Sequence, residues 1–374
     1  STAVPVFPAL AEGTYAVTAT ATDAAGNFTT DPTTSELVVD TSPVTVDVLQ
    51  TNNPQPLITG TAVVPTGGRL EVTVNGQTYD VPVTTEGVWQ LNLATAVPAF
   101  TPLADGIYSI TATVYDPSGT SISDPTTDEL QIDTTGPVVL AVDSLTPDGF
   151  YRAGASIAVQ VTFADDVVVD TTFGLPRLAL NTGRTAVYVP EASNARVLTF
   201  NYVVQAGDNT DDLDYPTIAA LSPNGATIRD GAGNDAELTL PIPGGPNSLG
   251  FNRSITIDTT PPSPPPTVDP LTTNNPLPTI TGTAELDTGE LLTVTVNGTT
   301  FPVFPDVDGR WTLDLSLANP LPDSPPLQPL AAGLRYNVIA AITDAAGNST
   351  TDQTSNELAI NSFAPLILGA IDDV

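Results

Sequence analysis

Short stretches of alternating apolar and polar residues, each ended by turn residues, recur along the whole chain. In one of them Tyr108, Ile110, Ala112 and Val114 alternate with Ser and Thr, which places these four side chains on one face of a β-strand. No apolar run with the 3.6-residue period of a helix accompanies these stretches. We therefore predict an all-β protein with almost no helix.

The alternating stretch around Tyr108 occurs three times. Its copies span residues 10–27, 103–119 and 330–348, and each contains a Gly turn, a Tyr, an alternating strand, an Asp and a second Gly turn. A second repeat pairs residues 51–62 with 273–284, and Trp89 with Trp311. Repetition at the spacing of domains indicates a tandem array.

The repeats divide the chain into five segments. We predict the C-terminal half of an immunoglobulin-like (Ig-like) domain at 1–42, a complete domain at 43–135, a longer variant at 136–260, a repeat of the complete domain at 261–362, and the first strand of a further domain at 363–374. The junctions at 40–43, 133–137 and 258–262 are short and contain proline, which fixes φ, so we expect stiff hinges.

The segment 43–135 carries the signs of a seven-stranded Ig-like sandwich. Asn75-Gly76 predicts a two-residue hairpin, Tyr108 is placed like a tyrosine corner, and Trp89 is a candidate core residue. Its predicted strands are 44–48, 57–64, 69–74, 77–81, 87–93, the Tyr108 strand and 130–133. In the longer variant we predict strands at 157–163, 177–180, 185–189, 197–204, 227–229, 237–240 and 254–257.

Composition excludes several classes of function. The chain has 374 residues and lacks Cys, His, Met and Lys, so it has no ligand set for structural zinc, no disulfide and no Ser-His or Cys-His nucleophile. Its nine basic residues, all Arg, face 42 acids for a net charge of −33, which disfavours nucleic acid and anionic membranes as partners. No signal peptide or membrane-spanning run is present, so we expect no membrane insertion of this segment. We predict no enzymatic activity.

Three motifs together resemble a known family. They are the Thr-Asp-Ala-Ala-Gly-Asn turn at 22–27 and 343–348, the Asp-Thr-Thr-Pro-Pro junction at 258–262, and the strand at 275–284. They resemble the bacterial Ig-like repeats of giant cell-surface adhesins, including those with calcium-stiffened extender domains. The longer variant, with its motifs at 208–215 and 227–235, resembles a repeat of very large bacterial and cyanobacterial surface proteins. The resemblance implies a structural, extracellular protein of the bacterial cell surface.

Calcium is the cofactor that we expect. It binds six to eight oxygens from carboxylates, carbonyls and Asn side chains. At a junction, the Asp-x-x-Gly-Asn turn and the terminal Asp of one domain could meet the first loops of the next domain, so that one ion would crosslink the two. Closely spaced carboxylates such as those at 208–214 would repel one another unless neutralised. The alternative is that Asp and Gly-Asn only shape tight turns. The candidate ligands are Asp23, Asn27, Asp40, Asp133, Asp165, Asp208, Asp211, Asp212, Asp214, Asp230, Asn234, Asp258, Asp344 and Asn348.

Two weaknesses and two alternatives accompany this interpretation. The turn at 116–120 lacks the Asn, and Asn361 replaces the junction Asp, which weakens a metal role at both places. The partners that we expect are neighbouring domains or copies of the protein, but 136–260 could instead be a module that binds host or surface glycans or a protein. The ragged ends suggest a window of a longer polypeptide, in preference to a filament subunit completed by strand donation.

Overall fold

The computed structural model describes residues 13–31, 37–39 and 44–361. These residues are almost entirely β-structure, with one four-residue helix, α1 (Leu249–Asn252), and two short 3₁₀ turns at Leu93–Thr95 and Pro190–Ala192. The all-β prediction is confirmed. None of the helices in the described ranges is long and apolar enough to span a membrane. The predicted strand at 363–374 and the candidate ligand Asp40 lie outside the described residues.

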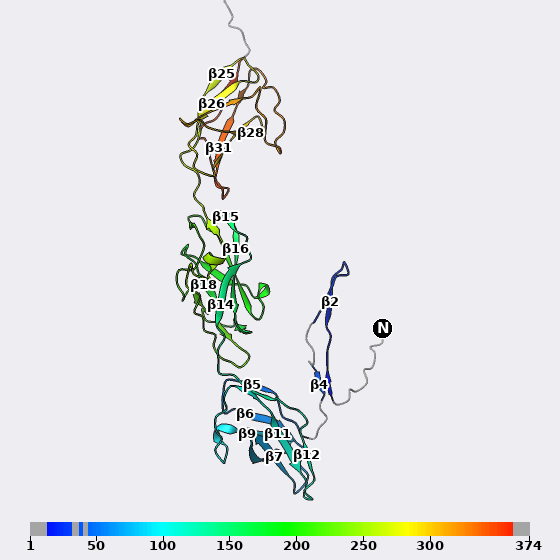
Figure 1. The fold of residues 1–374 in the computed structure, drawn as a ribbon. Helices are drawn as coiled ribbons and strands as arrows, with labels where there is room; N and C mark the ends of the chain where they lie inside the picture. Colours follow the sequence, from blue (N-terminus) through cyan, green and yellow to red (C-terminus); the bar gives the residue numbers. More distant parts are fainter. Residues whose placement is uncertain (1–12, 32–36, 40–43, 362–374) are drawn as a thin grey trace, which may run out of the picture. The chain divides into compact units, whose positions relative to one another are not determined.

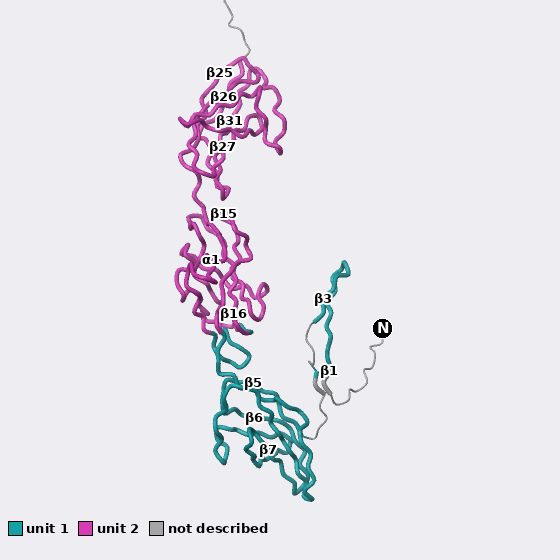
Figure 2. The backbone as a smooth tube through the Cα atoms, viewed as in Figure 1, with its two compact units in different colours: residues 1–137, 166–169, 228–236 teal, residues 138–165, 170–227, 237–374 magenta. Residues whose placement is uncertain are grey.

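The chain divides into two units (Figure 2). Unit 1 contains residues 1–137 together with 166–169 and 228–236, and unit 2 contains the remainder. For clarity we call residues 43–135 the Trp89 domain, 136–260 the long domain and 261–362 the Trp311 domain. The segment 228–236 belongs to the long domain in sequence but packs with unit 1.

The Trp89 domain, in unit 1, is a sandwich of antiparallel sheets around one core (Figure 1). Sheet β12-β11-β7-β8 faces the sheet β10-β13-β5 and the pair β6-β9, and β5 runs parallel to β13. Trp89 is fully buried in this core, as predicted. The strands are β5 (Leu49–Thr51), β6 (Leu57–Thr61), β7 (Arg69–Val74), β8 (Gln77–Val81), β9 (Val88–Asn92), β10 (Gly106–Tyr108), β11 (Ile110–Tyr115), β12 (Ser121–Ser123) and β13 (Leu130–Ile132).

The strand around Tyr108 differs from its prediction, because the chain changes sheets at Ser109. Tyr108 ends β10, which pairs with β13, whereas Ile110 begins β11, which pairs with β7. The buried carboxylate of Glu129 accepts the main-chain N–H of Ile110 at this break, at 2.8 Å. The Tyr108 hydroxyl donates back to the carbonyl of Ala104 at 2.9 Å, which is the predicted tyrosine corner.

The Trp311 domain, in unit 2, repeats this topology. Its sheets β32-β31-β27-β28 and β30-β33-β25 match those of the Trp89 domain, and β25 again runs parallel to β33. Glu357 repeats the role of Glu129 by accepting the N–H of Val338 at 3.0 Å. The strands are β24 (Thr267–Val268), β25 (Leu271–Thr273), β26 (Thr279–Thr283), β27 (Leu291–Val296), β28 (Thr299–Val303), β29 (Arg310–Asp314), β30 (Arg335–Tyr336), β31 (Val338–Thr343), β32 (Ser349–Thr351) and β33 (Leu358–Ile360).

The long domain is built around a six-stranded antiparallel sheet in unit 2, in the order β14-β16-β20-β19-β18-β21. The predicted strand at 237–240 is wrong, because only Glu237 makes an isolated bridge, to Val138. Four strands were not predicted: β14, β15, β17 and β21. The elements are β14 (Val139–Ser144), β15 (Gly149–Tyr151), β16 (Ser156–Phe163), β17 (Val168–Asp170), β18 (Arg177–Ala179), β19 (Thr185–Tyr188), β20 (Val197–Val203), β21 (Leu221–Ser222), β22 (Thr227–Arg229) and β23 (Ile255–Ile257).

The first segment contributes two strand pairs, β1–β4 and β2–β3. Val17, Ala19 and Ala21 are exposed, as expected for half a sandwich. The strands are β1 (Gly13–Tyr15), β2 (Thr20–Thr22), β3 (Phe28–Thr30) and β4 (Leu37–Val39).

Candidate functional site

Three turns of the form Asp-x-x-Gly-Asn share one internal geometry. In the turn at 344–348, Asp344 Oδ1 accepts the main-chain N–H of Asn348 at 2.8 Å, and Asp344 Oδ2 accepts the Asn348 amide at 2.9 Å. The turns at 230–234 and 23–27 have the same two hydrogen bonds, at 2.8 to 2.9 Å. The Gly before each Asn has φ between 86° and 93°, which favours glycine. The sequence therefore encodes a rigid turn that holds the Asn amide in place.

In two of these turns the Asn amide also reaches the end of the preceding domain. Asn234 Nδ2 donates to the main-chain carbonyl of Asp133 at 2.9 Å, within unit 1. Asn348 Nδ2 donates to the carbonyl of Asp258 at 3.0 Å, within unit 2. The structure thus brings together Asp133, Asp230 and Asn234, and likewise Asp258, Asp344 and Asn348. Each turn contacts the terminal Asp of the preceding domain, whereas we predicted that it would meet the first loops of the next domain.

The carboxylates of the two terminal Asp residues have a local role. Asp133 Oδ1 accepts the N–H of Thr135 at 3.0 Å, and Asp258 Oδ1 accepts that of Thr260 at 2.9 Å. Both bonds shape the chain as it leaves the last strand. The main-chain carbonyls, rather than the carboxylates, face the turn of the next domain.

Asp23 and Asp116 show the turn without such a contact among the described residues. The pKa of Asp23 is lowered, first by the hydrogen bond from the Asn27 side chain, although the turn is exposed. In the turn at 116–120 the pKa of Asp116 is lowered mainly by the hydroxyl of Ser118, and Thr120 stands where the other turns have Asn. The turn geometry therefore forms independently of a neighbouring domain.

Asp208 has a cationic partner within the chain. Its carboxylate is 2% exposed and accepts hydrogen bonds from Arg184 Nε at 2.7 Å, the Tyr202 hydroxyl at 2.7 Å and the N–H of Gln205 at 2.9 Å. Burial alone would raise the pKa of Asp208, but the hydrogen bonds from Tyr202, Arg184 and Gln205 outweigh it and lower the pKa. Its charge is balanced by Arg184, so the repulsion argument for calcium does not apply to this residue.

Asp212 and Asp214 form a second carboxylate pair in the same loop. A side-chain carbon on Gly250 would lie 2.8 Å from Asp212 Oδ2 and 3.0 Å from Asp214 Oδ2, so both oxygens border one spot beside α1. Burial raises the pKa of Asp212, and the charge of Asp214 raises it further. Asp214 Oδ2 also accepts the N–H of Gly244 at 2.8 Å. Two carboxylates that repel each other fit a cation better than Asp208 does.

The remaining candidates are dispersed. Asp165 is exposed just after β16, and Asp211 accepts the Thr256 hydroxyl with its main-chain carbonyl at 2.9 Å. Within residues 13–31, 37–39 and 44–361, no three Asp or Glu side chains converge closely enough to hold a metal ion. A calcium ion at a junction would therefore need carbonyl and Asn oxygens beside one or two carboxylates.

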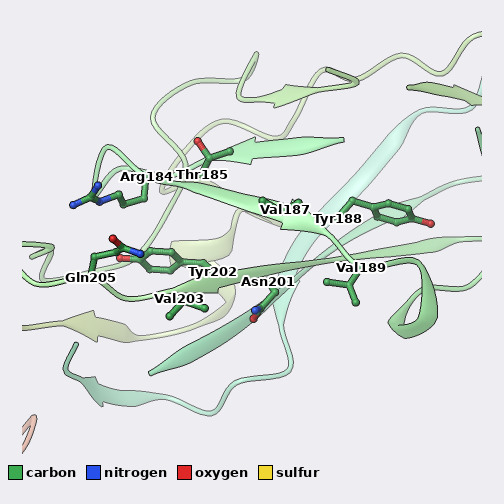
Figure 3. Close-up of a pocket in the computed structure, with 9 residues that line it drawn as sticks. All are labelled: Arg184, Thr185, Val187, Tyr188, Val189, Asn201, Tyr202, Val203 and Gln205. Atoms are coloured by element: carbon green, nitrogen blue, oxygen red, sulfur yellow. The ribbon is translucent and has the colours of Figure 1, made fainter. Parts of the chain in front are cut away.

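An open pocket of about 480 Å³ lies on the outer side of β19 and β20 in the long domain (Figure 3). Arg184 and Gln205 lie at one end, and Tyr188 and Val189 at the other. Tyr188 and Tyr202 are buried, and the Tyr202 hydroxyl is bonded to Asp208. The pocket therefore offers polar groups but no exposed aromatic ring on which a sugar could stack.

Comparison with known proteins gives one family match. Residues 46–134, nearly the whole Trp89 domain, match the family model of a bacterial Ig-like domain. No curated protein matches the chain. Among solved structures, one from a 1.5-MDa bacterial ice-binding adhesin, described for its host cell surface retention, is 18% identical in sequence to this chain. The match covers 86% of this chain and 100% of that chain, with a TM-score of 0.34. The human desmocollin-1 ectodomain is 13% identical, with 88% and 64% covered and a TM-score of 0.28.

Proposed function

We propose that this chain, a tandem array of bacterial Ig-like domains, is a structural and non-catalytic segment of a large protein of the bacterial cell surface. The observation that carries the proposal is the junction: at 133–137 and 258–262 the turn of one domain is hydrogen-bonded to the end of the domain before it. Domains joined by short proline segments and by such contacts suit a stalk, sheath or fibre that holds its parts at fixed distances.

Two features of the sequence support this role. The net charge of −33 keeps an extended surface soluble and resists self-association, and the absence of Cys and His removes the commonest catalytic groups. The alternative of a glycan-binding module in the long domain would use the pocket beside Arg184. Its lack of an exposed aromatic ring makes us favour the structural role.

Small-angle X-ray scattering of the whole chain tests the spacer role. Three and a half domains in line, with strands that rise by about 3.3 Å per residue, give a length of ~130 Å and a radius of gyration of about 37 Å. A compact chain of the same length would have a radius of gyration of about 21 Å. We expect the larger value, and a radius near the smaller one would contradict the proposal.

We further propose that calcium stiffens the array, with the Asp212–Asp214 pair and the junction oxygens as its ligands. An ion that binds only the folded state stabilises that state by mass action. We therefore expect millimolar calcium to raise the melting temperature by about 5 °C relative to a chelator. Magnesium should substitute poorly, because it prefers a small octahedral shell.

Matched variants assign the calcium effect to residues. Asp212→Asn should reduce the melting shift, because it removes one of the paired carboxylates, whereas Asp323→Asn on an exposed loop of the Trp311 domain should leave the shift unchanged. Calorimetry that shows the same melting temperature in chelator and in millimolar calcium would remove the metal from the proposal but leave the spacer role intact.

A further inference from the structure

Both described junctions contain the same hydrogen bond from the Asn of the turn. The Asn amide of the turn donates to the last Asp carbonyl of the preceding domain, at 2.9 Å for Asn234 and 3.0 Å for Asn348. In return, a carbonyl of the turn accepts a bond from the preceding domain. Ala232 accepts from the N–H of Asn52 at 3.0 Å, and Gly347 accepts from the Arg152 guanidinium. The two junctions thus share the Asn bond, whereas the returning bond comes from a main-chain N–H in one and from a guanidinium in the other.

We propose that the last residue of this turn determines whether a domain is fastened to the one before it. Asn fastens the domain, because its amide has two N–H groups and can bond the turn Asp and the neighbouring carbonyl together. Thr at the same position cannot, because its hydroxyl has one hydrogen on a shorter side chain. The partner that this surface fits is the end of another Ig-like domain of the same kind.

The turn at 23–27 has the same internal hydrogen bonds as the two turns at the junctions. In the turn at 23–27 all five residues are exposed, yet Asn27 makes the same bonds to Asp23, at 2.8 and 2.9 Å. A group held in its bound geometry loses little conformational entropy when the partner docks. The amide is thus presented by the turn itself and not by the junction.

Thr120 makes the Trp89 domain the exception. Its hydroxyl lies 3.1 Å from that of Ser118, and its N–H bonds Asp116 at 2.9 Å, both within its own turn. Thr120 therefore lacks the second N–H group by which Asn234 and Asn348 reach the preceding domain. The hydrogen-bond inference stands on the junction contacts, and only its biological purpose rests on the proposed spacer role.

Replacing Asn348 by Asp separates this fastening from a metal bridge. Aspartate keeps the oxygens that calcium would use and adds a charge, but it has no N–H for the carbonyl of Asp258 and it repels Asp344. If the amide fastens the joint, Asn348→Asp and Asn348→Thr should loosen it equally, with or without calcium. If an ion bridges the joint, Asn348→Asp should stay as tight as the unaltered chain when calcium is present.

Pulsed electron spin resonance on the whole chain measures the joint directly. The sequence contains no Cys, so Ala195→Cys and Thr312→Cys, both exposed, place one spin label on each side of the 258–262 junction. The loss of one hydrogen bond changes an equilibrium about five- to tenfold, so Asn348→Thr should raise the population outside the main distance peak by about that factor. Asn27→Thr is the matched control and should change nothing at this joint.

The Trp89 domain also shows that the test variant can fold. Thr occupies this position in the chain's own Trp89 domain, so Asn348→Thr is compatible with the fold, and melting curves of each variant verify this. An unchanged distribution in Asn348→Thr would overturn the inference. The spacer role would still depend on the scattering result.

Discussion

Gly60→Ala is expected to lower the unfolding free energy of the Trp89 domain by about 3 kcal/mol or more, beyond the usual cost of overpacking a core. Gly60 lies in β6 against the indole of Trp89. A side-chain carbon there would lie 2.1 Å from the carbonyl oxygen of Thr45 and 2.6 Å from Trp89 Cζ2. Neither neighbour can move freely, because Trp89 Nε1 donates to that same Thr45 carbonyl at 3.1 Å.

The second copy of the domain provides an internal check. A side-chain carbon on Gly282 would lie 2.0 Å from the Thr267 oxygen and 2.5 Å from Trp311 Cζ2, so Gly282→Ala should cost a similar amount, although Trp311 Nε1 makes no hydrogen bond like that of Trp89. Thr111→Ala, on the exposed side of β11, serves as the control and should have little effect. Denaturant unfolding of the four proteins measures these differences. A loss below about 1 kcal/mol for both glycine variants would show that the backbone relaxes around the methyl group.

Much of the fold can be predicted from the sequence. The repeated strand at 57–62 and 279–284, the Asn75-Gly76 hairpin and the buried Trp89 all follow from local rules on alternation and turns. The structure gives β7 and β8 the bounds that these rules predict. Local rules work here because each feature depends on residues close to one another in the chain.

The strand predictions fail where contacts between residues far apart in the chain determine the structure. Ser109 divides one alternating run between two sheets, because the buried carboxylate of Glu129 replaces the lost sheet bond of Ile110. Alternation alone cannot show such a change of partner. In the long domain, β14 was missed although it supplies a full edge of the six-stranded sheet. Its four apolar residues are consecutive and only Val142 is buried, so the strand shows no alternating pattern.

The candidate site has the same division. The turns at 230–234 and 344–348 are local motifs that the sequence shows, but the carbonyls of Asp133 and Asp258 that they contact lie far away in the chain. The partner of Asp208 could not be predicted. Arg184 lies in the turn between β18 and β19, whereas Asp208 lies in the loop after β20, and no sequence motif links the two residues. Only the folded sheet brings that guanidinium to the carboxylate.

Asp208→Asn should therefore be the most damaging change among the candidate ligands. The Asp208 carboxylate is buried while the Arg184 side chain is 46% exposed, so water partly screens the pair. Removing the charge of such a carboxylate should cost about 2 kcal/mol, because the donors that face it lose their acceptor. Here the amide would place N–H groups against donors, since Arg184, the Tyr202 hydroxyl and the N–H of Gln205 all donate to this site. We expect a loss of that size in unfolding experiments at neutral pH.

Asp235→Asn is the matched control. Asp235 pairs with Arg229 at 2.6 Å, a distance close to the 2.7 Å of the Arg184–Asp208 pair, but its side chain is 76% exposed where that of Asp208 is 2% exposed. Water already screens the exposed pair, so its loss should change stability far less. Equal effects of the two variants would show that burial of Asp208 does not determine its contribution.

The dependence on pH distinguishes the charge of Asp208 from its packing. Its pKa is lowered in the folded protein, so the unfolded chain takes up the proton first as the pH falls. The stabilisation is therefore complete above the ordinary Asp pKa of about 3.9 and disappears as the pH falls through the lower, folded value. Asp208→Asn has no such proton to bind. Its stability should accordingly fall less between pH 5 and 2 than that of the unaltered protein, and parallel acid profiles would contradict this assignment.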